Sequence, residues 1–300
     1  MTFTTQIKEE ITKEENNNIE DLTSLCTYLK FNATLEEDKM TVMVVNASVA
    51  RWIFKLLKTN YNVLIKLTTR TMKRFKARNL YILEVKEKLD LIYKDIDNIF
   101  KEINTSSDEE KKAFLKGMFL ACGSINDPKK LGYHMEFFID NKSEASFVSN
   151  ILNDFYINNK MLARDNNYMV YVKESEKIGD FLRIISANVA LLYFEDIRIY
   201  RDHKNMTNRL NNCEQANVDK IVSSAQNQLN DIKKLEDVIG FDLLDEKLQE
   251  VIVYRKKYPD VSLNDLSIIM TEETGKTITK SGLNHRFRKI QEMAKKLDDK

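Results

Sequence analysis

The order of apolar and polar positions predicts helices alternating with strand pairs over the first two hundred residues. Segments 47–59 and 143–157 repeat apolar residues at helical spacing. Each is followed by two short stretches rich in β-branched and aromatic residues, a pattern typical of paired strands, and then by a closing helix. The predicted strand pairs are 62–69 with 78–86 and 160–165 with 168–173.

An internal repeat underlies this pattern. Leu25–Leu35 aligns without gaps on Leu115–Ile125, and after a five-residue insertion Asn46–Trp52 aligns on Asn141–Phe147. We predict repeats at about 20–103 and 108–203, each of order αββαββα, within one α+β domain of residues 1–205. Two such repeats are expected to place two helices side by side and to merge their strands into one curved antiparallel surface.

The last sixty residues have a different, purely helical pattern. Apolar positions over 243–258 follow a helical period that ends at Pro259. Ser262 and Asp265 form a capping-box-like helix start, and Gly275 ends that helix. A third helix opens at Thr279, with Ile278 and Leu283 spaced as a hydrophobic staple. The spacing predicts a helix-turn-helix domain over 241–300, with a long connection from Thr271 to Thr279.

The third helix has a buried face and a polar face. Leu283, Phe287, Ile290 and Ala294 form its apolar stripe. The opposite face carries hydrogen-bonding and cationic groups suited to base edges and phosphates, and Gly282 allows close approach to a phosphate. The candidate residues for binding double-stranded DNA are Lys280, Ser281, Gly282, Asn284, His285, Arg286, Arg288 and Lys289. A three-helix packing module without DNA binding is the alternative.

A narrow apolar stripe joins the two parts. From Val218 to Ile239 it predicts a helix over Glu214–Ile239 that Gly240 ends, within a linker of residues 206–240. Such a stripe either packs on its own domain or pairs with another chain.

The net charge of +1 conceals two basic regions. Between Lys39 and Leu83 the chain has ten Lys and Arg residues and no acid, and Lys276–Ile290 has five and no acid. The turn between strands 62–69 and 78–86 concentrates the first group, so we predict a second, sequence-indifferent DNA contact there. Its residues are Arg70, Lys73, Arg74, Lys76 and Arg78. Attraction to an acidic protein, or simple solubility, would explain the same charges.

Residue spacing gives no sign of catalysis, metal or cofactor. The three histidines lie far apart, and the three cysteines form no CxxC pair, which fits a reducing cytosol. No apolar run is long enough for a membrane span, and the acidic N-terminus is unlike a signal peptide. We therefore expect no catalytic residue, no cofactor, no metal and no membrane association, and a cytoplasmic, nucleoid-associated location.

The segment Leu115–Ser124 resembles the LAGLIDADG helix of homing endonucleases, with matches at Leu115, Gly117, Ala121 and Gly123. In those enzymes the eighth position of the motif is an acid that binds the divalent metal. Here the two copies have Asn32 and Cys122, and neither is a hard anionic ligand for Mg²⁺. We expect nuclease chemistry to be absent.

A degenerate LAGLIDADG-like pair followed by a helix-turn-helix resembles the WhiA family of bacterial transcription regulators. The resemblance covers nearly the whole chain and is carried by Phe3–Glu10, Phe119–Pro128, Asn208–Arg209 with Asn212–Asn217, and Thr279–Ile290. It implies a non-enzymatic, sequence-specific DNA-binding regulator linked to cell division, chromosome segregation or sporulation in a Gram-positive bacterium, with RNA polymerase or another transcription regulator as partner. The alternatives are a LAGLIDADG-type endonuclease or maturase, and a protein-interaction adaptor.

Overall fold

The computed structural model describes residues 1–14, 17–72, 78–130, 132–164 and 167–298, and separates them into two units. The first unit is Met1–Asp202 and the second is His203–Lys300. Each has a hydrophobic core of its own. No helix in the described part of the chain is long and apolar enough to cross a membrane.

The first unit contains the predicted repeat, preceded by α1 (Phe3–Ile11). The first copy consists of α2 (Asn18–Asn32), β1 (Ala33–Leu35), β2 (Met40–Val44), α3 (Ala47–Tyr61), β3 (Ile65–Met72), β4 (Arg78–Val85) and α4 (Leu89–Glu102). The second consists of α5 (Asp108–Cys122), β5 (Gly123–Ile125), β6 (Met135–Ile139), α6 (Lys142–Asp154), β7 (Lys160–Arg164), β8 (Asn167–Val172) and α7 (Ser175–Ile184). The predicted order αββαββα is confirmed in both copies.

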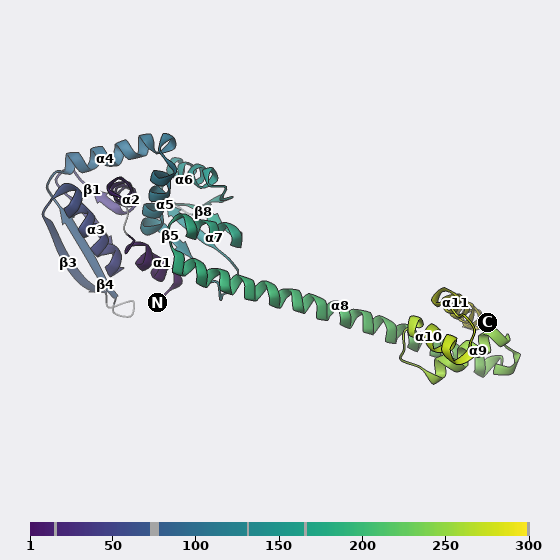
Figure 1. Ribbon diagram of the computed structural model, residues 1–300. Coiled ribbons are helices and arrows are strands. Elements are labelled where there is room, and N and C mark those ends of the chain that lie inside the picture. The colour runs from purple at the N-terminus through teal and green to yellow at the C-terminus, as the bar shows by residue number, and fades with distance from the viewer. Residues whose placement is uncertain (15–16, 73–77, 131, 165–166, 299–300) are drawn as a thin grey trace. The chain divides into compact units, whose positions relative to one another are not determined.

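The strands form separate sheets rather than one merged surface, so that part of the prediction was wrong. Among the described residues there are two four-stranded antiparallel sheets, ordered β1-β2-β4-β3 and β5-β6-β8-β7. The strands that follow the central helices, β1 and β5, are three residues long and pair only within their own copy. In Figure 1, α2 and α5 lie between the two sheets, which keeps the strand ladders apart.

Small side chains allow α2 and α5 to pack closely. A Cβ atom on Gly117 would lie only 2.3 Å from the backbone oxygen of Ser24, so a larger residue does not fit. The Ser24 hydroxyl donates a hydrogen bond of 2.9 Å to the backbone oxygen of Ala113 on the facing helix. Thr27 is buried one turn further along α2. The expected side-by-side placement of the two central helices is therefore confirmed, and small residues make it close.

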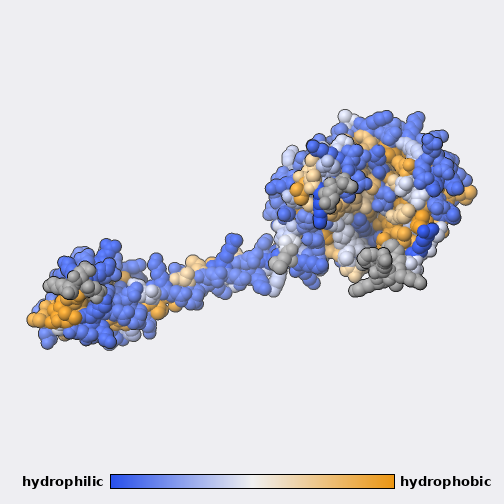
Figure 2. Space-filling model, turned by 180° about the vertical axis from the view of Figure 1, so that it is seen from behind, coloured by the Kyte–Doolittle hydropathy of each residue, from blue (hydrophilic) through white to orange (hydrophobic). Residues whose placement is uncertain are grey.

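Helix α8 (Asn188–Val238) begins well before the helix predicted over Glu214–Ile239. Residues 202–220 are all exposed, and Figure 2 shows the surface of this stretch as mainly hydrophilic. A helix without an apolar face has no hydrophobic period, so the sequence pattern revealed only its later part.

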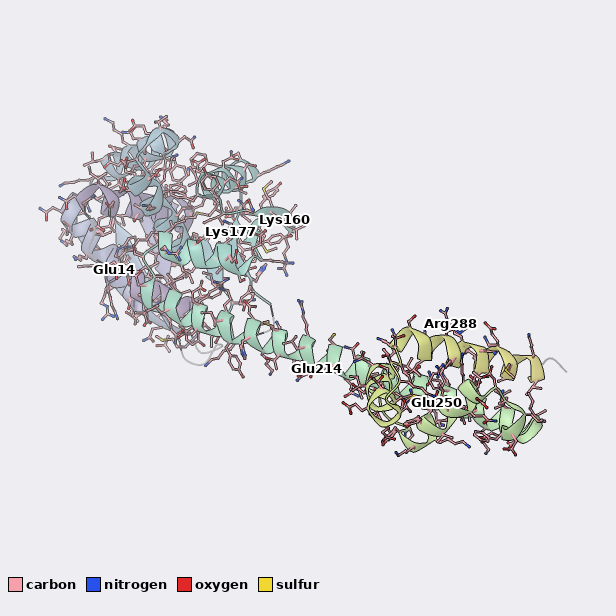
Figure 3. The ribbon with its side chains drawn as sticks, turned by 45° about the vertical axis from the view of Figure 1, so that its right-hand side comes forward. Glu14, Lys160, Lys177, Glu214, Glu250 and Arg288 are labelled. Carbon is pink, nitrogen blue, oxygen red and sulfur yellow. The ribbon has the colours of Figure 1, made fainter. Side chains whose placement is uncertain are left out.

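The second unit packs three further helices against the end of α8. They are α9 (Glu246–Lys257), α10 (Leu263–Thr274) and α11 (Lys280–Asp298), and a short 3₁₀ turn, Phe241–Leu243, precedes them. Ile232 and Leu235 of α8 are fully buried in this core, so this half of the apolar stripe packs on its own domain. Val218 and Val222 are 52% and 46% exposed. Figure 3 labels Glu250 on α9 and Arg288 on α11.

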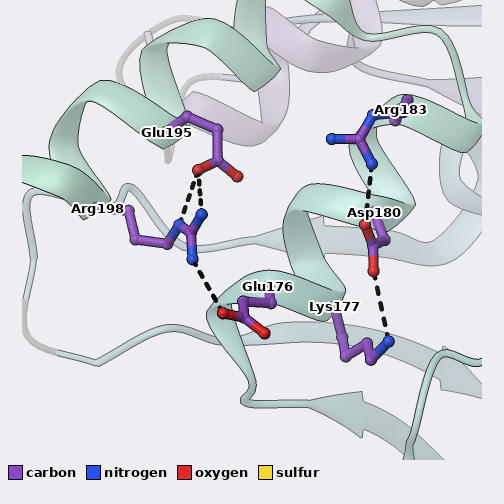
Figure 4. A network of polar contacts seen from close by, with 6 residues as sticks. All are labelled: Glu176, Lys177, Asp180, Arg183, Glu195 and Arg198. Carbon is purple, nitrogen blue, oxygen red and sulfur yellow. Dashed lines mark hydrogen bonds and ion pairs between the residues drawn. The ribbon is translucent and has the colours of Figure 1, made fainter.

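Polar contacts within the first unit hold the first turns of α8. The Glu10 carboxylate accepts hydrogen bonds from the backbone N–H groups of Val189 at 2.6 Å and Ala190 at 3.0 Å, which satisfies free donors at the helix start. Arg198 pairs with Glu195 on the same helix and with Glu176 on α7 at 3.5 Å (Figure 4).

Candidate nucleic-acid interface

Hydroxyl side chains cap the start of α10 and bond its last turn, which leads to the turn before α11. The Ser262 hydroxyl accepts the backbone N–H of Asp265 at 3.1 Å, so the predicted start of α10 is confirmed. The hydroxyls of Thr271 and Thr274 donate to backbone oxygens four residues earlier, at 2.7 and 2.6 Å, as the helix continues to Thr274. Gly275 then ends it with a left-handed backbone, φ +67°.

The connection is consequently shorter than predicted, because it begins after Thr274 and not at Thr271. The backbone N–H of Ile278 donates to the Thr271 hydroxyl at 3.1 Å, which ties the end of the connection to α10. The Thr279 hydroxyl accepts the backbone N–H of Gly282 at 3.1 Å and caps α11. Ile278 and Leu283 are both buried, as expected for a hydrophobic staple. This geometry is a helix-turn-helix whose second helix is fixed at its N-terminus.

The apolar stripe of α11 is confirmed: Leu283, Phe287, Ile290 and Ala294 are all buried. Behind Phe287 lies Arg255 of α9, which is 1% exposed, with its guanidinium 5.4 Å from the ring centroid. Arg255 donates to the backbone oxygens of Val261 at 2.8 Å and Tyr258 at 3.3 Å, so it holds the α9–α10 connection. Burial lowers its pKa. No spacing in the sequence distinguishes this arginine from the basic residues that follow it.

The predicted DNA-binding residues differ in their exposure, and two of them, Arg286 and Lys289, lie near an acid. Most lie on the open side of α11, and Figure 3 shows Arg288 on the side away from Glu250. The exposed residues are Lys280, Ser281, Asn284, His285, Arg288 and Lys289. Gly282 is half-buried, and a Cβ there would lie 3.4 Å from the Thr279 hydroxyl.

Arg286 is directed toward α9 and not to the open side of α11. Its Nη1 is 3.1 Å from Oε2 of Glu250 on α9, and its side chain is 25% exposed. Lys289 is 3.9 Å from Asp245, the residue that caps the start of α9, while half of its side chain stays exposed. Arg286 is therefore placed to fix α11 against α9, and the exposed residues remain for contact with a ligand.

The first basic region is described only in part. Arg70 is exposed on β3, and Arg78 begins β4. Lys73, Arg74 and Lys76 lie outside the described residues, so the predicted second DNA contact stays a prediction.

The positions of the motif acid lie at the ends of α2 and α5. The amide oxygen of Asn32 accepts the Tyr28 hydroxyl at 3.0 Å, and the Cys122 thiol donates to the backbone oxygen of Met118 at 3.5 Å. Burial raises the pKa of Cys122 to about 12, so the thiol is neutral. Lys8 of α1 donates to the backbone oxygen of Leu120 at 3.0 Å, and burial lowers its pKa to about 8. The described residues contain no group of three His, Cys, Asp or Glu side chains that would hold a metal ion.

These features define a class of protein: a duplicated LAGLIDADG-like fold followed by a helix-turn-helix domain. Three family models match the chain: the WhiA N-terminal LAGLIDADG-like domain at residues 19–99, the WhiA LAGLIDADG-like domain at 111–204, and the WhiA C-terminal HTH domain at 207–294. The chain belongs to the WhiA family.

The similarity to relatives and to a solved structure extends over 99% of the chain. It is 38% identical to "Probable cell division protein WhiA" of Oceanobacillus iheyensis, over 99% of this chain and 98% of that protein. It is 40% identical to the protein of the same name from Bacillus cytotoxicus, over 99% and 97%. The crystal structure of full-length DUF199/WhiA from Thermatoga maritima is similar over 99% of both chains, with TM-score 0.61 and 21% identity. Because the identity to this crystal structure is 21%, the similarity shows the fold alone.

Proposed function

We propose that the protein is a sequence-specific DNA-binding transcription regulator linked to cell division, and that it is not an enzyme. The observation that carries the proposal is the open face of α11, where Ser281, Asn284, His285 and Arg288 are exposed on a helix whose start and inner face are fixed. The names of the relatives support the link to cell division. Chromosome segregation and sporulation are related processes in which it would act.

In this function α11 enters the major groove with its N-terminal half. Arg288 is suited to bidentate pairing with guanine, and Asn284 to pairing with adenine. The backbone N–H groups near Gly282 and the side chain of Lys280 are suited to phosphate contacts at the helix start. Arg286, paired with Glu250, acts as a positioning residue rather than as a reader.

The absence of catalysis is proposed on the chemistry of the former acid positions. A neutral thiol at Cys122 and an amide at Asn32 are poor ligands for Mg²⁺. The first unit would then serve as a scaffold, a weak DNA clamp or a surface for RNA polymerase or another regulator, on a protein that acts at the nucleoid in the cytoplasm.

The test is a comparison of two variants of the full chain. Its preferred DNA site is first selected from random duplexes, and affinity is then measured on that site and on single-base variants of it. Arg288→Ala should reduce discrimination at one base pair by about 1–3 kcal/mol. Neutralising Arg70, Lys73 and Arg74 together should weaken binding alike on all sequences and flatten its salt dependence. Equal effects of the two variants would refute this division of roles.

The alternatives predict other outcomes. Site-specific cleavage with Mg²⁺ or Mn²⁺ that disappears in Cys122→Ala would establish an endonuclease. Undetectable binding to any DNA at low salt, where phosphate contacts dominate affinity, would favour a protein-interaction adaptor.

A further inference from the structure

A groove runs between α8 and α11 within the second unit. One part of it, a cavity of about 370 Å³, is lined by residues of these two helices. A second cavity of about 430 Å³ lies between α8 and the starts of α10 and α11. Lys220 and Ser224 line both cavities, so the two are neighbouring parts of one groove, which we name the α8–α11 groove.

Both walls of the groove are polar stripes at helical spacing. The α8 wall includes Asn217, Lys220, Ser224 and Asn227. The α11 wall includes Lys280, Asn284, Arg288 and Gln291, with Phe287 between them. Ile221 and Ala225 of α8 also line the second cavity, whereas Ile232 is buried in the core of the unit. Apart from Phe287, every residue that lines the first cavity is polar, and seven of the eleven that line the second are polar as well. Because facing helices of one domain normally close their contact with apolar side chains, this predominance of polar groups indicates a surface for a polar ligand.

The charge of the groove favours a polyanion. Lys220, Lys280 and Arg288 contribute cations, and hydrogen-bonding side chains such as those of Asn217, Ser224 and Asn284 line the same cavities. One carboxylate of the lining, Asp231, has an interaction partner of its own and stands eleven residues after Lys220. That separation is about 16 Å along a helix axis. The end of the groove near the start of α11 is therefore cationic.

The position of α8 relative to α11 determines where DNA would meet it. Packed helices lie about 8–10 Å apart, and the major groove is about 12 Å wide. A helix beside one that occupies the major groove therefore lies over a bordering sugar–phosphate strand. Asn284 and Arg288 belong both to the reading face and to the wall of the groove, so the strand next to the bases they read would pass Lys220.

We propose that Lys220, with Asn217 and Ser224, holds the sugar–phosphate strand that borders the major groove occupied by α11. The α8 stripe is then the second half of the DNA interface and supplies affinity without reading bases. The inference rests on the proposed DNA binding and adds to it a phosphate-binding surface outside the helix-turn-helix.

The experiment compares Lys220→Ala with Lys233→Ala in the full chain. Lys233 is also exposed on α8, and at 100° per residue its side chain points about 140° away from that of Lys220, so the variant has the same charge without touching the groove. Binding is measured between 50 and 200 mM salt on the selected site and on an unrelated duplex. Lys220→Ala should weaken both complexes about three- to tenfold and reduce the salt slope by about one, with base discrimination unchanged.

A second variant, Asn217→Asp, introduces a negative charge into the same wall and should weaken both complexes as well. The groove proposal is overturned if Lys220→Ala binds with unchanged affinity and slope while Arg288→Ala still loses discrimination. It is equally overturned if Lys233→Ala has the same effect as Lys220→Ala. A wild-type chain that binds no DNA would overturn the proposed function itself, so the two failures are distinguishable.

Discussion

Replacing Gly117 by alanine tests the packing of α2 on α5, around which the first unit is built. The new Cβ would lie 2.3 Å from the backbone oxygen of Ser24 and 2.9 Å from the Cβ of Thr27. Neither atom can rotate away, because one belongs to the main chain and the other is the branch point of its side chain. The two helices would therefore have to separate by roughly 1 Å to restore ordinary van der Waals contact.

The magnitude follows from two opposing terms. Overpacking a core costs about 1–3 kcal/mol, whereas alanine in place of glycine favours a helix by about 1 kcal/mol. Separation of the helices also stretches the 2.9 Å hydrogen bond from Ser24 to Ala113, which places the first term in its upper range. We expect the free energy of unfolding of the first unit to fall by about 1–2 kcal/mol, and its Tm by about 2–8 °C.

Tryptophan fluorescence provides the assay. Trp52 is the single tryptophan of the chain, it is 6% exposed, and its ring centroid lies 5.9 Å from that of Tyr28 on α2. Its emission therefore reports the unfolding of the first unit in the full chain. Gly179→Ala on α7 is the matched control, because the only close contact of its Cβ would be with the end of the flexible Glu195 side chain, at 2.6 Å, while Leu191 would lie at an ordinary 3.8 Å. Unchanged stability of Gly117→Ala, or equal losses in both variants, would refute the close-packing explanation.

Two further predictions concern the cap of α10 and the buried amine. Ser262→Ala should destabilise the second unit by about 1 kcal/mol because Asp265 loses its capping partner; circular dichroism should show this while the Trp52 transition stays in place, and a shift of that transition instead would contradict it. Burial lowers the pKa of Lys8 from 10.5 to about 8, so below pH 8 folding carries the cost of burying its ammonium. Between pH 8 and 10.5 the amine is neutral in the folded state, and this cost declines as the pH rises. The free energy of unfolding of wild type relative to Lys8→Met should therefore increase between pH 8 and 10.5, by at most about 3 kcal/mol, and parallel pH curves for the two proteins would disprove it.

The sequence predicts the second unit well because its signals are local. The stripe of Leu283, Phe287 and Ile290, the cap at Ser262 and the break at Gly275 all act within one or two helical turns. The repeat in the first unit is visible for a related reason, since two copies of one pattern reinforce each other.

Long-range contacts explain what the sequence could not reveal. The pairing of Arg286 with Glu250 joins residues 36 positions apart, and nothing in the spacing separates Arg286 from the exposed Arg288. Arg255 resembles any cation at the end of a helix, yet it is buried and holds a connection together. The contact of Lys8 with Leu120 spans 112 positions. Charge alone therefore overestimates the number of residues free to contact DNA.

The contact of Lys8 with α5 also bears on the position of the motif acid. The Lys8 ammonium and the Cys122 thiol are close enough to affect one another's pKa, so a cation of the protein already lies beside the place of the motif acid. An acid restored by Cys122→Asp would meet this ammonium, which would compete with a divalent cation for the new carboxylate. What the first unit retains is the close helix pair around Gly117 and Ser24, and that packing needs no metal. Its fold can thus persist for a structural reason alone, which is consistent with the proposed role as scaffold or binding surface.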